Sequence, residues 1–144
     1  MQILGEWFPC DDGVIRPVVR GEIQTAHGDW LYTPFLIDTG ADCTAFDSFT
    51  HLALGLPPMP ENIRLGGVGG TVRMVVVSTA VRHTDDTGTK VLFRGHYAAA
   101  TDPEALDMSV LGRDITDLFA IIVDRPGNVV CLVGQRHSYR IERR

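Results

Sequence analysis

The sequence predicts an all-β single domain with one or two short helices. Most apolar residues stand in short runs separated by turn residues, a pattern typical of sandwiches and barrels. The chain has 144 residues, of which 44% are hydrophobic. That length is sufficient for one hydrophobic core and too short for two. We therefore expect one β domain built around a single core.

The order of apolar runs and turns along the chain gives the expected elements. We expect strands at 14–23, 30–37, 72–81 and 90–100, with turns at 27–29 and 85–88. Asp47 is suited to cap a short helix that runs to Leu54, because its side chain can accept hydrogen bonds from free backbone N–H groups. The proline-rich residues 56–60 suit neither a helix nor a strand and are expected to form a linker.

The last third of the chain is expected to contain a short helix and then a hairpin. Residues 116–119 fit the helix. Residues 120–133 fit a β-hairpin with its turn at 124–128. The chain is accordingly divided into an N-terminal segment (1–13), a domain (14–134) and a basic C-terminal tail (135–144).

Charge argues against one large functional class. The formal net charge is -5, whereas a nucleic-acid binder needs clustered lysines and arginines to neutralise phosphates. The basic cluster of the chain is its tail, with Arg136, Arg140, Arg143 and Arg144. A solvated chain end explains that cluster more simply than a binding site does. We expect no nucleic-acid partner.

Cysteine usage and hydropathy set further expectations. Cys10, Cys43 and Cys131 are odd in number and far apart, which does not suggest a disulfide framework. No pair of cysteines or histidines has the spacing of zinc ligands, so we expect no metal and no other cofactor. No apolar run approaches about 20 residues, which predicts no membrane segment. The expected location is the cytoplasm.

One segment carries the first functional signal. Phe35-Leu36-Ile37-Asp38-Thr39-Gly40-Ala41-Asp42 delivers a carboxylate, a hydroxyl and a glycine turn at the end of an apolar strand. Asp38 is then either a solvated turn residue or a functional carboxylate held in a shielded place. For an isolated Asp-Thr-Gly the turn interpretation is favoured.

Two further segments change that balance. Leu65-Gly66-Gly67-Val68-Gly69-Gly70-Thr71 is a glycine-dense hairpin tip, and glycine there permits close approach of the backbone to a ligand. Its spacing does not match either phosphate-binding glycine loop. Val110-Leu111-Gly112-Arg113-Asp114-Ile115 places an apolar pair, a glycine and a charged pair ahead of the expected helix.

In this order and spacing, the three segments resemble those of the retropepsin-like aspartic proteases, the family of retroviral proteases. They look like the active-site loop, the flap and the hydrophobic-hydrophobic-Gly-Arg-Asp element of that family. The arrangement spans roughly residues 15–133. The resemblance implies a retropepsin-like acid-protease barrel that cleaves peptides. With a single Asp-Thr-Gly in a chain of this size, it also implies a homodimer.

The resemblance assigns roles to individual residues. Asp38 matches the catalytic aspartate, and Thr39 matches the threonine that hydrogen-bonds across the dimer axis. Gly40 matches the glycine whose carbonyl faces the substrate. Asp42 and Arg113 match an ion pair, expected to be buried, that ties the active-site loop to the helix behind it.

The substrate would lie between the active-site loop and the flap. The residues expected to contact it are Ala41, Asp42, Gly66, Gly67, Val68, Gly69 and Gly70. The flap glycines would let the hairpin close over an extended peptide and exclude water. Two carboxylates that share a proton can activate a water and protonate the carbonyl oxygen together, since like charges so close cannot both ionise cheaply.

The chain departs from the retroviral pattern at two places. Cys43 stands where many retroviral members have another aspartate, which removes a charge from the expected cleft. Cys43 is interpreted as a small buried residue rather than a redox sensor. The added hairpin looks more like the retropepsin-like domains of cellular DNA-damage-inducible ubiquitin-shuttle proteins, where a hairpin pairs across the dimer.

Asp114 is interpreted as a helix-start residue favoured by the helix dipole.

The leading hypothesis is a homodimeric aspartic endopeptidase that hydrolyses extended peptides, using a water activated by Asp38 from each of two chains. The alternative is a catalytically silent retropepsin-like module for binding or dimerisation. A third possibility is an autoinhibited regulatory protease that acts on one partner. The intact Asp-Thr-Gly and flap glycines favour the first hypothesis.

Overall fold

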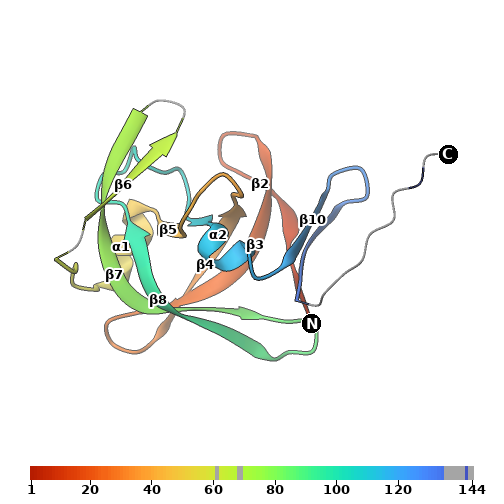
Figure 1. Cartoon of the computed structure of the whole chain (residues 1–144), viewed down its shortest axis with the longest axis horizontal. Helices are drawn as coiled ribbons and strands as arrows, with labels where there is room; N and C mark the ends of the chain where they lie inside the picture. The colour runs from red at the N-terminus through yellow and green to blue at the C-terminus, as the bar shows by residue number, and fades with distance from the viewer. Residues whose placement is uncertain (61, 68–69, 135–141, 143–144) are drawn as a thin grey trace.

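The computed structural model describes residues 1–60, 62–67, 70–134 and 142. In chain order the strands are β1 (Gln2–Leu4), β2 (Glu6–Pro9), β3 (Ile15–Gln24), β4 (Trp30–Ile37), β5 (Ala45–Phe46), β6 (Asn62–Gly67), β7 (Gly70–Thr84), β8 (Lys90–Ala99), β9 (Val110–Leu111), β10 (Ala120–Asp124) and β11 (Val129–Val133). The helices are α1 (Ser48–Leu54) and α2 (Arg113–Thr116). The predicted all-β class is therefore confirmed, and Figure 1 shows long curved strands with two short helices packed beside them.

Most strands belong to one curved sheet that closes on itself. Within the described residues its order is β2-β3-β4-β9-β5-β8-β7-β6, and β3 pairs additionally with β7. That closing contact is short, since it consists of the antiparallel pairs Glu22↔Arg82 and Ile23↔Val81. The sheet is thus a barrel with a narrow seam between β3 and β7.

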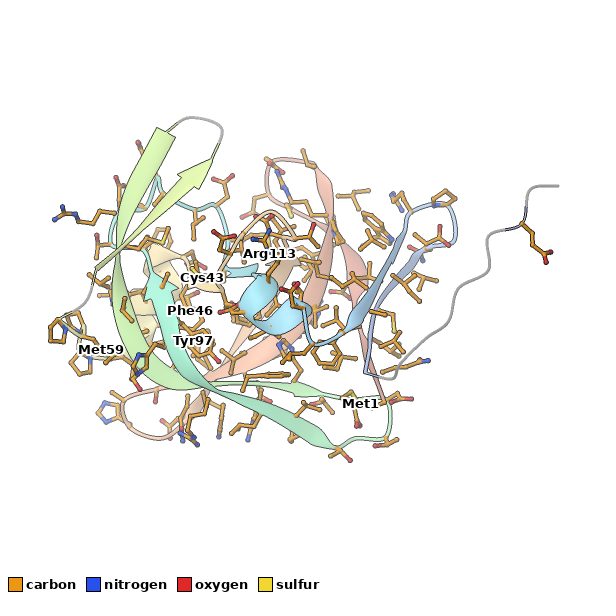
Figure 2. All side chains as sticks on the ribbon, in the orientation of Figure 1. Met1, Cys43, Phe46, Met59, Tyr97 and Arg113 are labelled. Carbon is orange, nitrogen blue, oxygen red and sulfur yellow. The ribbon has the colours of Figure 1, made fainter. Side chains whose placement is uncertain are left out.

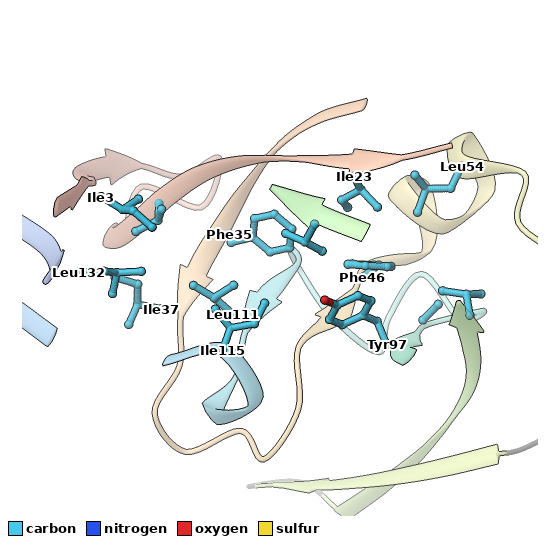
Figure 3. Close-up of a cluster of buried hydrophobic side chains, with 14 of the residues drawn as sticks. Ile3, Ile23, Phe35, Ile37, Phe46, Leu54, Tyr97, Leu111, Ile115 and Leu132 are labelled. Carbon is cyan, nitrogen blue, oxygen red and sulfur yellow. The ribbon is translucent and has the colours of Figure 1, made fainter. Parts of the chain in front are cut away.

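Alternation along the strands builds the core inside this barrel. Val19 and Ile23 of β3 and Phe35 of β4 are fully buried, as every second residue of a half-buried strand should be. The Phe46 ring lies 6.3 Å from the Phe35 ring and 5.6 Å from the Tyr97 ring, measured between centroids. Figure 3 shows these rings together with buried aliphatic side chains from several strands. Each such large side chain contributes about 1.5–3 kcal/mol by leaving water.

Helix α1 begins where the sequence predicts. The Asp47 side chain caps it by accepting a 2.9 Å hydrogen bond from the Thr50 N–H. The helix ends at Gly55, whose φ of 63° is a left-handed conformation that glycine adopts without strain. The Asp47 carboxylate also accepts a hydrogen bond from the Ser109 hydroxyl at 2.9 Å. Asp47 therefore fixes α1 to the segment that leads into β9.

Helix α2 lies three residues earlier than the predicted helix at 116–119. The short strand β9 ends at Leu111, and Gly112 becomes the N-cap, with extended backbone angles. The Gly112 carbonyl then accepts hydrogen bonds from the Ile115 and Thr116 N–H groups. The helix starts early because β9 is held in the sheet right up to Gly112, a constraint that the local sequence does not contain.

Both ends of the domain contribute to a second, three-stranded sheet with the order β1-β11-β10 in the described part of the chain. The predicted C-terminal hairpin is present as β10 and β11, paired from Ala120↔Val133 to Asp124↔Val129. The segment 1–13 joins the fold, because β1 pairs with β11 and β2 pairs with β3. The predicted basic tail lies outside the described residues except for Glu142.

Three of the hairpins in the described residues share a direction. The β6–β7, β2–β3 and β10–β11 hairpins all project toward the top of Figure 1, with helix α2 below and between them. This arrangement gives the molecule one side rich in loops and one side where β7 and β8 cross the barrel. In the described ranges, no helix is both long enough and apolar enough to cross a membrane.

Candidate active site

Asp38 stands at the point where β4 leaves the core. The last two residues of β4 pair in parallel with β9, as Leu36↔Val110 and Ile37↔Leu111. The Asp38 N–H continues that ladder by donating to the Leu111 carbonyl at 3.1 Å. Because Leu111 is fully buried, the ladder anchors the start of the loop in the core. The Asp38 side chain is half-buried, in contrast to a freely solvated turn residue.

Residues 38–42, named here the Asp38 loop, form a tight turn around the carboxylate. The Gly40 N–H donates to the Asp38 Oδ1 atom at 3.0 Å, and the Ala41 N–H donates to the Asp38 carbonyl at 3.2 Å. A Cβ atom at Gly40 would lie 3.2 Å from the same Oδ1 atom, so a side chain there would crowd the carboxylate. Thr39 and Gly40 are exposed at the tip of the loop.

Arg113, at the start of α2, holds the Asp38 loop from behind. Its guanidinium donates to the Thr39 carbonyl at 3.1 Å and forms an ion pair with Asp42. Its backbone N–H donates to the Ala41 carbonyl at 2.9 Å. The sequence predicts that this ion pair is buried, which is wrong for the single chain: the Asp42 side chain is 82% exposed and that of Arg113 is 44% exposed. Exposed pairs contribute about 0–1 kcal/mol, so the two carbonyl contacts are the firmer part of the tie.

Asp114 also binds the chain next to the Asp38 loop, through Thr44. The interpretation of Asp114 as a residue favoured by the helix dipole does not include this contact. Its carboxylate accepts hydrogen bonds from the Thr44 N–H at 2.9 Å and from the Thr44 hydroxyl at 2.7 Å. The Thr44 hydroxyl in turn accepts from the Gly112 N–H at 3.1 Å. Thr44 is fully buried, so these contacts satisfy polar groups that water does not reach. Asp114 and Thr44 are 70 residues apart, and no local pattern links them.

The close packing around residue 112 requires a glycine at this position. A Cβ atom at Gly112 would overlap the carbonyl group of Cys43 and lie 2.7 Å from the Thr44 nitrogen. Both contacts are with backbone, which cannot swing aside as a flexible side chain can. Gly112 therefore lets the start of α2 pack directly on the chain that leaves the Asp38 loop.

The surroundings of the Asp38 loop are apolar. A buried cluster of Ala45, Met74, Ala98, Ala100 and Val110 is joined by the partly buried Leu36, Ala41, Cys43, Ala105 and Leu106. Burial raises the pKa of the Cys43 thiol, and the nearby Asp114 and Asp42 carboxylates raise it further. The thiol therefore stays protonated at neutral pH, where it is a weak nucleophile.

The glycine-rich segment is a β-hairpin, as its sequence predicts. Strands β6 and β7 pair from Asn62↔Val75 to Gly67↔Gly70. Gly66, Gly67 and Gly70 thus belong to the paired part of the hairpin. Val68 and Gly69, which the sequence places at the tip, lie outside the described residues. Figure 2 shows Cys43 and Arg113 near the centre of the molecule, between this hairpin and the β10–β11 hairpin.

Comparison with known proteins tests the fold. No protein-family model matches the chain, and no curated protein sequence matches it. Among solved structures, EIAV protease complexed with the inhibitor HBY-793 aligns with 25% identity and a TM-score of 0.49, over 71% of this chain and 86% of that chain.

A second solved structure, a retropepsin-like aspartic protease from Rickettsia conorii, aligns with 16% identity and a TM-score of 0.54. The alignment covers 92% of this chain and 89% of that chain. The chain has a retropepsin-like fold. In this retropepsin-like fold, the Asp38 loop, the β6–β7 hairpin and the Gly112–Arg113 element follow one another along the chain in the order that the sequence resemblance implies.

Proposed function

We propose that the chain is a homodimeric aspartic endopeptidase that hydrolyses peptide bonds in extended substrates. The observation that carries the proposal is the setting of Asp38: a half-buried carboxylate at the end of a core strand, oriented by the Gly40 N–H and held by Arg113 through the loop backbone. A carboxylate fixed in this way is ready to act without reorganisation. The Rickettsia protein of similar fold is an aspartic protease, which supports the proposal.

The chemistry requires a second carboxylate. Among the hydrogen bonds of the described residues, the Asp38 carboxylate accepts from the Gly40 N–H, and no second carboxylate joins it. The symmetry mate of Asp38 in a second copy of the chain would supply the missing group. One carboxylate of the pair would then take a proton from water, while the other gives a proton to the peptide carbonyl oxygen. Thr39, exposed at the loop tip, would hydrogen-bond across the two-fold axis.

The substrate would lie as an extended strand between the Asp38 loop and the β6–β7 hairpin. The hairpin would close as a flap and offer its backbone groups to the peptide. The paired end of the hairpin contains Gly66, Gly67 and Gly70. Val68 and Gly69, which the sequence assigns to the same contact with substrate, lie outside the described residues. Ala41 and Cys43 bring apolar surface to the floor of the site, and the Cys43 thiol stays uncharged. We therefore expect a preference for apolar over charged side chains next to the cleaved bond.

The second copy would join along strand β10. This strand is an edge of the three-stranded sheet, and its Ile122 and Val123 side chains are 45% and 46% exposed. Leu118, just before β10, is 63% exposed. An open edge strand with apolar side chains is a template for pairing with another chain. Antiparallel pairing of two β10 edges about a two-fold axis would cover these side chains in the proposed dimer.

The test is a mixing experiment with an inactive partner. Asp38→Asn removes the carboxylate at nearly constant shape, so its homodimer is expected to cleave no peptide from a diverse library at any pH between about 3 and 7. A re-equilibrated 1:1 mixture with wild type is expected to retain about one quarter of the activity of wild type at equal total concentration, because half of all dimers are mixed and a quarter are mutant. Sedimentation of both proteins checks that they form dimers.

Asp29→Asn is the matched control. Asp29 is an exposed aspartate at the opposite end of β4, and its mixture with wild type is expected to keep full activity. Cleavage by Asp38→Asn at the wild-type rate contradicts the proposal. Dimers of wild type that cleave nothing would instead favour a catalytically silent dimerisation module. Activity of the 1:1 mixture at one half rather than one quarter would contradict the shared site.

A further inference from the structure

The barrel seam between β3 and β7 contains a buried histidine that the proposed chemistry does not use. His83 of β7 is 1% exposed. Its ring lies between the aromatic rings of Phe35 on β4, at 5.8 Å, and Phe93 on β8, at 6.3 Å between centroids. Gly21 on β3 makes room for it, because a Cβ atom there would lie 2.7 Å from the His83 Cε1 atom. The seam is therefore shaped around this ring.

The His83 ring replaces a hydrogen bond that the strands cannot make. Its Nδ1 atom lies 2.9 Å from the Arg20 carbonyl oxygen, which can only accept, so Nδ1 carries the proton and donates. Arg20 and Pro34 form a pair of the β3–β4 ladder that exchanges no hydrogen bond, because this part of β4 directs its backbone groups away from β3, as the Leu36 N–H does toward Ser109, so the Arg20 carbonyl points to the other side of β3. On the other side of β3, pairing with β2 ends at Val18 and pairing with β7 begins at Glu22. The imidazole supplies the donor at this gap.

The second ring nitrogen is left without a counterpart. With Nδ1 protonated, a neutral ring carries a lone pair on Nε2, which is buried and has no hydrogen-bond partner among the described residues. Protonation of Nε2 would create a cation with no acceptor between two aromatic rings. Burial lowers the pKa of His83, and its contact with the Arg20 carbonyl opposes that shift without overcoming it.

The charged groups on the adjoining strands do not compensate such a cation. On β3 and β7, the Arg20 side chain pairs with Glu6, and the Arg82 side chain pairs with Glu22, at partly exposed positions. Lys90 of β8 pairs with the same Glu22. Strands β4 and β8 face the ring with Phe35 and Phe93. The folded barrel therefore holds His83 neutral, while the unfolded chain can protonate it freely.

We propose that His83 is an acid-sensitive latch: it closes the β3–β7 seam while neutral, and its protonation opens the barrel. The direction of the pH dependence follows from the different proton binding of the folded and unfolded chains. The stability that the latch contributes is complete above about pH 6.5, the ordinary value of an unfolded histidine, and is lost as the pH falls through the lower folded value. For catalysis, an inference that rests on the proposed function, the latch sets an acid limit through unfolding rather than through the Asp38 pair.

Denaturant unfolding at pH 7.5 and 5.5 tests the latch, with wild type compared to His83→Asn. Asparagine can keep a donor toward the Arg20 carbonyl but cannot be protonated. Between these pH values, the unfolding equilibrium constant of wild type is expected to rise about tenfold more than that of His83→Asn, because one proton binds to the unfolded chain alone. Trp30, whose ring lies 3.8 Å from the Arg82 guanidinium carbon beside the seam, serves as a fluorescence reporter.

His96→Asn is the matched control, because His96 is a histidine on the neighbouring strand β8 that is exposed to solvent, in contrast to the buried His83. It is expected to keep the wild-type dependence on pH. Equal dependence in wild type and His83→Asn overturns the latch, whether or not the protein cleaves peptides. If His83→Asn does not fold, the ring is followed by NMR in wild type: it should remain the neutral Nδ1–H tautomer in the folded chain at pH 5.5. A ring that titrates near 6.5 without unfolding overturns the proposal.

Discussion

Replacing Gly112 by alanine is expected to damage both the stability and the candidate site. The added Cβ atom would lie 2.7 Å from the Thr44 nitrogen and would overlap the Cys43 carbonyl group. Non-bonded heavy atoms rest at about 3.5 Å or more, so the two backbones must separate by roughly 0.8 Å at least. Overpacking of this kind costs typically 1–3 kcal/mol. Because the obstacle is backbone on both sides, we expect a loss of about 3 kcal/mol.

The same displacement moves the chain directly behind the Asp38 loop. A shift of about 1 Å in a catalytic geometry costs on the order of 100-fold in rate. Gly112→Ala is therefore expected to lower peptide hydrolysis about 100-fold under conditions where the protein is still folded. Urea unfolding gives the stability, and hydrolysis of a peptide that wild type cleaves gives the rate.

Gly95→Ala provides the comparison within β8. A Cβ atom at Gly95 meets its nearest neighbour, the Tyr97 hydroxyl oxygen, at 3.9 Å, which is ordinary contact. Alanine in a strand is favoured over glycine by roughly 0.5–1 kcal/mol, so this variant should be as stable as wild type or slightly more stable. The reasoning is refuted if Gly112→Ala unfolds at the same urea concentration as Gly95→Ala and cleaves at the wild-type rate.

Two further predictions concern the same region. Asp114→Ala leaves the buried Thr44 N–H and hydroxyl without their acceptor and is expected to lower the free energy of unfolding by about 1–3 kcal/mol. Asp114→Asn keeps an acceptor oxygen and should lose less stability. Equal urea midpoints for the two variants would contradict this prediction. Burial, with a smaller contribution from Asp114, raises the pKa of Tyr97 to about 12. The stability that the Tyr97 hydroxyl contributes is complete below about pH 10 and is lost as the pH rises through the pKa of the folded state. Tyr97→Phe should therefore reduce the loss of stability that unfolding curves show between pH 8 and 11.5. An unchanged dependence of stability on pH in this range would argue against the prediction.

Local signals carried the parts of the fold that the sequence predicts correctly. Strand β4 runs over the predicted residues because its apolar run is followed at once by the Asp-Thr-Gly turn. The Asp47 cap acts over three residues, and the β10–β11 hairpin is held by its own short turn. In each case the partners lie close in the chain, so the pattern of residues is sufficient.

Predictions failed or were incomplete where the decisive contact is distant in sequence. Helix α2 starts at Arg113 because β9 is fixed in the sheet, and not where the local pattern suggested. The Asp42–Arg113 pair is present, but its exposure depends on how the loop sits on the surface. The tie between Asp114 and Thr44 joins two segments that only the barrel brings together.

By itself, the sequence determined an all-β chain with a carboxylate at the end of a core strand, a glycine-rich hairpin and a Gly-Arg-Asp element. These features follow from residue type and from contacts within a few positions. The tertiary structure alone decided that Arg113 binds the Asp38 loop, that Asp114 and Gly112 bind Thr44 just after it, and that His83 fills the β3–β7 seam at the Arg20 carbonyl. The reason is physical: barrel closure brings strands from distant parts of the chain together, and the free backbone groups and spaces at their meeting points exist only in the closed fold.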